Sequence, residues 1–132
     1  ASLDRPNAVA VFRRDPTSGA LTFLEVQKDG VGGVDGLFLV KSVAISPGEK
    51  NLYAAGGGDD AVAVFSRDPT TGALAFVEKR QDGVKGVDGL DGAISLTISP
   101  DEKHVYAVGT RDNAVAVFSV AYPEAAAPRD SE

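Results

Sequence analysis

The chain of 132 residues contains no cysteine, no methionine and no tryptophan, and no apolar run in it approaches the length of a membrane span. Without cysteine there is no disulfide, no thiolate metal site and no cysteine nucleophile. A membrane-crossing helix needs about 18 consecutive apolar residues, so we expect no transmembrane segment. A chain that begins at Ala1 and lacks methionine indicates processing or trimming, and we favour a periplasmic or extracellular location.

Positive charge is also scarce, with 13 Lys and Arg against 19 Asp and Glu and a net charge of −6. Nucleic-acid binding needs clustered basic side chains against the phosphates, so we expect no nucleic-acid partner. The hydrophobic fraction of 43% is ordinary for a folded domain and too high for a disordered chain. These totals indicate one globular, acidic domain.

The dominant feature is an internal repeat. The hexapeptides NAVAVF, DAVAVF and NAVAVF begin at Asn7, Asp60 and Asn113, which are 53 residues apart. Residues 7–59 and 60–112 are identical at 32 of 53 positions without a gap. We therefore divide the chain into repeat units 7–59 and 60–112 and a partial unit 113–120, which together make a repeat domain over 1–120.

Each unit predicts four short strands. The segments 42–46 and 95–99 (SVAIS, SLTIS) run into Pro-containing turns, and 51–56 and 104–109 (NLYAAG, HVYAVG) follow them. The copies of NAVAVF form a third strand, and 20–27 and 73–80 (ALTFLEVQ, ALAFVEKR) form a fourth. The fourth strand is the most polar, so we expect it at a sheet edge. β-branched residues dominate, Gly or Pro interrupts every dozen positions or fewer, and no 3.6-residue period occurs, so the pattern favours strands over helices.

The third strand, AVAVF, is apolar on both faces, whereas a sheet with one wet face would alternate apolar with polar residues. The sheets are therefore expected to be covered on both sides. Four-stranded antiparallel sheets that repeat along a chain and stack face to face are the blades of a β-propeller. The predicted fold class is all-β, with about nine strands in propeller blades.

The segments SPDEKHVYAVGTRDNAVAVFS (99–119) and DPTTGALAFVE (68–78) resemble the repeat of the lactonase-type seven-bladed β-propellers, whose units carry the pattern SPDGKHVYV…NTVSVF…TGALT. The resemblance covers roughly residues 5–120, and the pattern is shared by many bacterial proteins. Gly48 stands where that pattern has Asp, and LFLVKS (37–42) stands where the second copy has LDGAIS. The resemblance implies the propeller fold, but we assign no catalytic residue from it.

In the strand order of that family, this chain has the third and fourth strands of one blade, one full blade, and the first three strands of another. About two and a quarter blades cannot close a ring, and each outer blade leaves an apolar face in water. We therefore expect a homo-oligomer, three copies giving roughly a six-bladed ring. The alternatives are that the chain is a piece of a larger propeller, or that it docks in a larger protein complex that covers the open faces. The tail 121–132, rich in Ala, Pro and charge, is expected to be disordered or bound to a partner.

Between the fourth strand and the next first strand lies a glycine-rich segment, DGVKGVDGLDGA (82–93), with a near-copy, DGVGGVDGLFLV (29–40). Collagen requires longer Gly-X-Y tracts with abundant proline. A phosphate cradle requires a following helix, and aspartates repel phosphate. The favoured interpretation is a turn in which glycines adopt φ > 0, aspartates accept backbone hydrogen bonds, and Val31, Val34, Leu37 and their copies fill the gap between blades.

A bound calcium ion is the alternative interpretation of this segment, because hard cations bind clustered carboxylates on loops. Its candidate ligands are Asp29, Asp35, Asp82, Asp88 and Asp91, although Phe38 replaces Asp91 in the first copy. Propeller topology would gather these loops with the turns GGGDDA and GTRDNA on one face, whose acidic rim is Asp29, Asp35, Asp59, Asp60, Asp82, Asp88, Asp91 and Asp112.

No catalytic residue is predicted. His104, the only histidine, begins a strand after an exposed turn, and Asn51 takes its place in the first copy. Ser46 and Ser99 are expected to hydrogen-bond at strand-to-turn junctions rather than act as nucleophiles. The near-identity of the copies favours a non-enzymatic structural or binding module that completes its fold by self-assembly or docking, with no cofactor. The alternative is a lactone hydrolase resembling the 6-phosphogluconolactonase-type propellers, acting at the acidic face.

Overall fold

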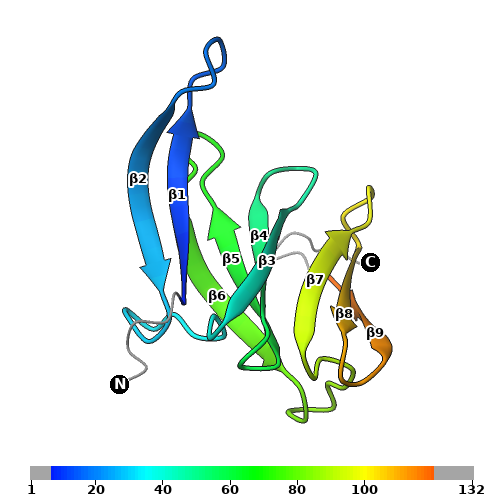
Figure 1. Cartoon of the computed structure of the whole chain (residues 1–132). Helices are drawn as coiled ribbons and strands as arrows, with labels where there is room; N and C mark the ends of the chain where they lie inside the picture. The colour runs from blue at the N-terminus through cyan, green and yellow to red at the C-terminus, as the bar shows by residue number, and fades with distance from the viewer. Residues whose placement is uncertain (1–6, 121–132) are drawn as a thin grey trace, which may run out of the picture.

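The computed structural model describes residues 7–120, whose regular structure consists of nine β-strands (Figure 1). The strands are β1 (Ala8–Arg14), β2 (Leu21–Lys28), β3 (Val40–Ile45), β4 (Asn51–Gly56), β5 (Ala61–Arg67), β6 (Leu74–Gln81), β7 (Ala93–Ile98), β8 (His104–Gly109) and β9 (Ala114–Ser119). Within the described range, no helix is long and apolar enough to cross a membrane. The tail 121–132, for which we predicted disorder or a bound partner, lies outside the described residues.

The strands form three separate antiparallel sheets. The first sheet contains β1 and β2, the second contains β3-β4-β5-β6, and the third contains β7-β8-β9, each in sequence order. This confirms the all-β fold class and the predicted order of strands. As predicted, the fourth strands β2 and β6 lie at the edges of their sheets. Even the irregularities repeat: a register shift follows Val11 in β1 and Val64 in β5.

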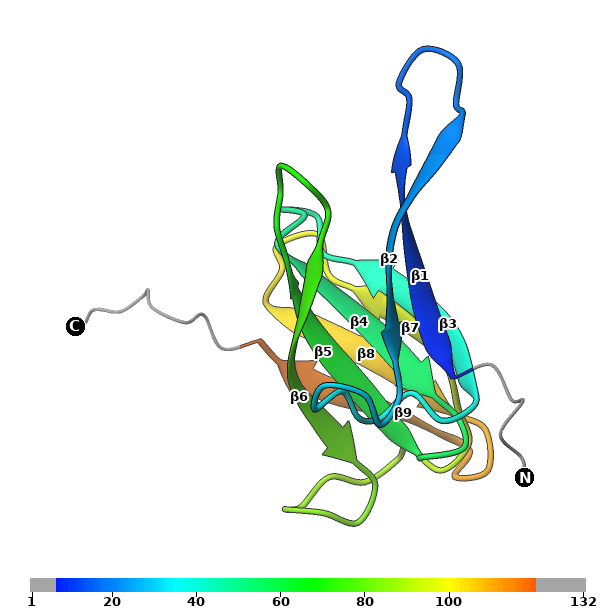
Figure 2. The ribbon, with the colours of Figure 1, turned by 90° about the vertical axis from the view of Figure 1, so that its left-hand side faces the viewer.

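The three sheets stand side by side, with the second sheet in the middle (Figure 1). Viewed from the side of the first sheet, the β1–β2 hairpin projects past the other two sheets at its turn (Figure 2). That turn, which begins at Asp15, is built locally. The Asp15 carboxylate accepts hydrogen bonds from the backbone N–H groups of Thr17 and Ser18 at 2.8 and 3.0 Å, and Asp68 does the same for its own turn.

The second sheet is covered on both faces, as its sequence predicts. Ala54, Ala63 and Phe65 point into a cluster shared with the first sheet, which adds Val9 and Val11. Alternate residues point the other way, into a cluster shared with the third sheet; they include Tyr53, Ala55, Val62, Val105, Ala107 and Ala116. Side chains of successive strand residues lie on opposite faces, so each strand of the second sheet contributes to both clusters. Many of these side chains are Ala, whose small size lets the neighbouring sheets approach closely.

The outer faces of the first and third sheets are open. On the first sheet Phe12 and Phe23 are 47% and 58% exposed, although Phe65, one period after Phe12, is fully buried. On the third sheet Val115 and Val117 are each 59% exposed. Within residues 7–120, the expectation that the sheets are covered on both sides therefore holds for the second sheet only, because the other two have a neighbouring sheet on one side.

Candidate functional site

The glycine-rich connectors are the segments that join one sheet to the next: residues 29–39 join β2 to β3, and residues 82–92 join β6 to β7. Each makes the same tight turn, in which the N–H of Gly30 or Gly83 donates to the carbonyl of Val34 or Val87 at 2.8 Å. Gly36 has a φ of 91°, and a Cβ there would lie 3.1 Å from the Cβ of Lys79. Only glycine fits this close approach in a left-handed conformation.

The hydrophobic residues between these glycines divide into two groups. Val34, Leu37 and Leu90 are buried between sheets, and Val87 is partly buried against the cluster shared by the second and third sheets, which confirms their predicted role in filling the gap. Val31 and Val84 are 59% and 46% exposed, so the prediction was wrong for them. Both stand next to the glycine of the tight turn, where the chain bends out into solvent. The connector is thus anchored by its second half and exposed at its tip.

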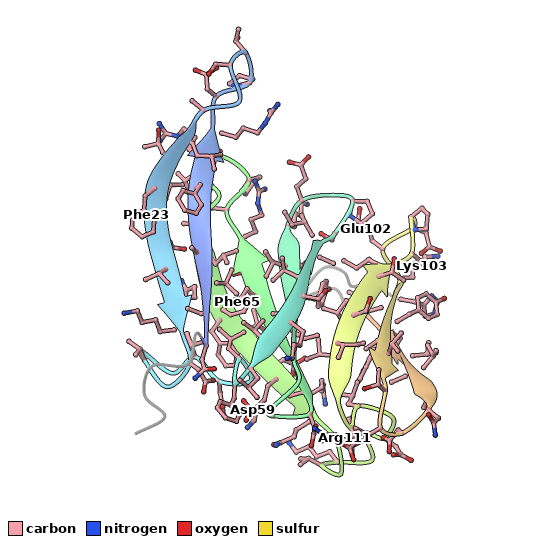
Figure 3. The ribbon with its side chains drawn as sticks, viewed as in Figure 1. Phe23, Asp59, Phe65, Glu102, Lys103 and Arg111 are labelled. Atoms are coloured by element: carbon pink, nitrogen blue, oxygen red, sulfur yellow. The ribbon has the colours of Figure 1, made fainter. Side chains whose placement is uncertain are left out.

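The aspartates of the connectors lie in two triads. The first triad is Asp29, Asp35 and Asp59, and the second triad is Asp82, Asp88 and Asp112. In each triad one carboxylate oxygen per residue lies within 4.8 Å of the others. Two members come from a connector and the third from the turn before the sheet's third strand. The triads lie at the end of the sheets where Asp59 and Arg111 are seen, opposite Glu102 and Lys103 (Figure 3).

Both triads use the same hydrogen bonds to hold the connector in place. Asp29 and Asp82 accept from the N–H of Leu37 and Leu90, each at 3.1 Å. Asp59 and Asp112 accept from the next N–H along the connector, each at 3.2 Å. Asp35 and Asp88 accept from the following glycine at 2.8 Å. This confirms the structural interpretation of the loop, in which aspartates bind nearby backbone N–H groups.

Lys79 distinguishes the first triad from the second. Its ammonium lies 2.8 Å from Asp35, and this hydrogen-bonded ion pair lowers the pKa of Asp35 and raises the pKa of Lys79. Burial raises the pKa of Asp59, and the negative charges of Asp29 and Asp35 add to the effect. The first triad is therefore already paired with the ammonium of Lys79. The residue one period after Lys79 is Glu132, so the sequence offers the second triad no matching lysine.

Four of the five predicted metal ligands are in the triads, and Asp91 is not. Asp91 instead forms an ion pair with Arg111 at 3.0 Å. The third members, Asp59 and Asp112, belong to the predicted acidic rim but were not among the predicted ligands. The sequence feature that could have identified Asp59 and Asp112 as ligands is their position in matching turns one period apart. A triad offers three carboxylates, and a calcium ion takes six to eight oxygen ligands, so backbone carbonyls or water would complete its coordination. Metal binding stays a prediction.

The residues that could have suggested catalysis lie elsewhere. His104 begins β8, directly after Lys103, at the end of the sheets opposite the triads (Figure 3). The Ser46 and Ser99 hydroxyls accept hydrogen bonds from the N–H groups of Asn51 and His104 at 3.2 and 3.1 Å. This confirms their predicted role at the strand-to-turn junctions. The chemistry available at the loop face is that of carboxylates, two of which pair with the basic side chains of Lys79 and Arg111.

Comparison with known proteins supports the fold. No protein-family model and no curated protein matches the chain. Solved structures do match it. The periplasmic gluconolactonase PpgL of Pseudomonas aeruginosa is 24% identical over 86% of this chain and 30% of its own, with a TM-score of 0.68. A Bacteroides fragilis protein whose proposed activity is that of a 6-phosphogluconolactonase is 24% identical over 86% and 29%, with a TM-score of 0.66.

A third structure, of a protein from Lactobacillus plantarum, is 23% identical over 87% of this chain and 32% of its own, with a TM-score of 0.68. The three sheets are β-propeller blades. The comparison supports the resemblance to lactonase-type propellers at the level of the fold. The chain spans about a third of the length of each of these three structures.

Proposed function

We propose that these blades belong to a lactonase-type propeller that hydrolyses a sugar-derived lactone at the loop face. The observation that carries the proposal is the convergence of two aspartate triads at one end of blades that resemble those of a gluconolactonase. Carboxylates at such a face suit ester hydrolysis, because a positioned base that accepts a proton from water accelerates its attack on a carbonyl.

In this proposal, a carboxylate of a triad accepts a proton from water as the water oxygen bonds to the lactone carbonyl carbon. The tetrahedral intermediate then breaks its ring C–O bond, and the ring oxygen takes up a proton to give the open hydroxy acid. Asp59 suits the role of base in the first triad, because its raised pKa makes its carboxylate the better proton acceptor. A calcium ion bound at a triad would supply polarisation of the lactone carbonyl.

The test is hydrolysis of glucono-δ-lactone followed at constant pH, with calcium and with a chelator. We expect hydrolysis above the protein-free rate, and its loss when Asp59 and Asp112 are both changed to Asn, which keeps an acceptor for the connector N–H groups. Exchange of Asp91 for Asn, outside the triads, is the matched control. Equal rates with and without protein contradict the proposal. If calcium does not change the melting temperature and a chelator does not change the rate of hydrolysis, calcium has no part in the proposed reaction.

A second candidate is a non-enzymatic module that completes its fold by self-assembly or by docking on a partner protein. Its specific support is the pair of open apolar faces, on which Phe12, Phe23, Val115 and Val117 are exposed. The near-identity of the two units supports it too, because an enzyme brings different residues from different blades to one site. The mass of the particle in solution tests this candidate.

A further inference from the structure

Beside β9 lies an apolar groove between the second and third blades, with a volume of about 460 Å³. β9 is the last strand of its sheet in the described chain, so its outer edge faces this groove. The walls come from β4, β5 and β6 on one side and from β8 and β9 on the other. The lining residues that matter below are Val62, Val64, Glu78, Arg80, Val105 and Phe118.

The corresponding space between the first and second blades is filled by side chains of β6. Leu74 is 8% exposed there, and Phe76 packs edge-on against Phe65 with ring centroids 5.6 Å apart. Both Leu74 and Phe76 come from β6, the fourth strand of the second blade, and both pack in the cluster that contains Val9 and Val11. The described part of the third blade stops at its third strand.

The walls of the groove are the repeat copies of the residues around Leu74 and Phe76. One period separates Val62 and Val64 from Val9 and Val11, and Phe118 from Phe65. The groove is therefore the space that the fourth strand of the third blade would fill.

The polar groups of the groove are also copies of groups that hold a strand. Between the first two blades, the Glu25 carboxylate accepts the N–H of Leu74 at 2.7 Å, and the Gln27 amide donates to the carbonyl of Leu74 at 2.9 Å. One period later these positions are Glu78 and Arg80, which line the groove and pair with each other at 3.4 Å. The Glu78 carboxylate can therefore accept a backbone N–H, and the Arg80 side chain can donate to a backbone carbonyl, of a strand that enters the groove. Extended segments add to the open edges of sheets through backbone hydrogen bonds of this kind.

The chain carries a strand that matches this groove. Leu21 and Phe23 of β2 are the copies of Leu74 and Phe76, and they are 62% and 58% exposed on the open face of the first blade. Phe23 already packs on Phe12 with a centroid distance of 5.7 Å, close to that of the buried Phe65–Phe76 pair. The residues that follow β9 match poorly: one period after Leu74 and Phe76 the sequence has Ala127 and Arg129.

We propose that the β1–β2 hairpin of a second copy of this chain occupies the groove. Its β1 takes the place of β9 beside β8, since residues 8–12 and 114–118 have the same sequence, AVAVF. Its β2 then becomes the fourth strand, with Leu21 and Phe23 in the groove and Glu78 and Arg80 on the backbone of Leu21. A chain's own hairpin packs on the opposite face of the second blade, so the occupant comes from another copy.

This exchange rests on the second candidate function and specifies its partner and contact. It is head-to-tail, because the groove at one end of a copy receives the hairpin at the other end of the next. Residues 7–112 are two whole periods, so each copy adds two complete blades and the strand β9 becomes redundant. Repetition of the contact extends the row of blades toward a closed ring.

The experiment uses the absence of cysteine from the full chain. A Leu21→Cys variant is mixed with a differently tagged Arg80→Cys variant, and a short bismaleimide cross-linker is added. We expect a cross-linked product that contains both tags, because Gln27 and Leu74 contact at the copied position. A Val31→Cys variant mixed with Arg80→Cys is the matched control, since Val31 is equally exposed but lies on a connector. It is expected to give at least tenfold less product.

Adding Phe23→Glu to the Leu21→Cys chain is expected to abolish the product without a change in its circular dichroism spectrum, because Phe23 is exposed in the single chain. Adding Val31→Glu instead is expected to leave the product intact. A product no greater than that of the control overturns the exchange, and so does a product that survives Phe23→Glu. If light scattering still shows an assembled particle in that case, the second candidate stands without this contact. If it shows a monomer, both fail.

Discussion

At the scale of single residues, repeat copies with the same identity have different chemistry. Asp35 and Asp88 make the same hydrogen bond to the following glycine, but Asp35 also pairs with Lys79. Asp59 lies beside two other carboxylates and is partly buried, so its pKa is raised, whereas the ammonium of Lys79 lowers the pKa of Asp35. Within one triad, ionisation therefore costs stability at one residue and adds stability at another.

Asp59→Asn is expected to raise the melting temperature at pH 7. Because the pKa of Asp59 is raised in the folded state, its contribution to stability is present below its ordinary value of 3.8 and is lost as the pH rises through the raised pKa. Asparagine removes this cost and keeps an acceptor for the N–H of Phe38. Melting curves from pH 3 to pH 8 should show the difference between variant and wild type shrink toward zero below about pH 4.

Asp35→Asn is the matched control with the opposite sign. Its pKa is lowered, so the ionised form adds stability above the ordinary value of 3.8, and this stability is lost as the pH falls through the lowered pKa. The variant should be less stable at pH 7, by less than about 1 kcal/mol because water still reaches the half-exposed pair of Asp35 and Lys79. Stability changes of the same sign for both variants would contradict this account of the triad.

At the scale of elements, the energetic weight of a strand residue depends on whether another blade covers it. Phe12 and Phe65 occupy the same position in β1 and β5, and each forms an edge-on pair with a phenylalanine of the next strand. Phe65 is fully buried against the first blade, whereas the described part of the chain places no blade over Phe12. Local sequence and strand pairing are therefore alike, and stacking alone makes the difference.

Phe65→Ala is expected to lower the free energy of unfolding by about 3–5 kcal/mol, the usual cost of truncating a buried phenylalanine. Phe12→Ala should cost less, about 1.5 kcal/mol, because Phe12 is already 47% exposed and packs on Phe23 at the open face. Urea unfolding at low protein concentration, where assembly is weakest, measures both. Equal losses would show that the open face of the first blade is covered even in the dilute protein.

At the scale of the whole molecule, three stacked sheets leave two unlike apolar faces at opposite ends. The face of the first blade carries Phe12, Leu21 and Phe23, and the face of the third blade carries Val115 and Val117. Exposed apolar patches of this kind mark interaction surfaces. The exchange proposed above joins two unlike faces, so its contacts would be head-to-tail and would not end with a dimer unless a ring closes.

Gel filtration with light scattering is therefore expected to give a mass several times the 13.6 kDa of the chain. The Phe23→Glu variant should move the particle toward the mass of a single chain, because it places a charge on the open face. The exposed Val31→Glu exchange controls for added charge alone. A wild-type monomer that melts cooperatively would contradict self-assembly.

Much of this protein is determined by its sequence. The apolar strand AVAVF and the turn residues around Asp15 and Asp68 act over a few neighbouring positions, and they recur every 53 residues. The strands, their order and the all-β class therefore follow from a local pattern and its repetition. The burial of Leu37 and Leu90 between blades was also predicted from their three-residue spacing, but the same spacing predicted burial of Val31 and Val84, which are exposed.

Other features are decided only by the tertiary structure. Asp59 lies beside Asp29 and Asp35 because the fold brings its turn against a connector. Asp91 belongs to neither triad and instead forms an ion pair with Arg111. The exposure of Phe12 and the burial of Phe65 likewise depend on which blades have neighbours. The physical reason is the same in each case: charge pairing and burial depend on distances through space between residues far apart in the chain, which local pattern does not contain.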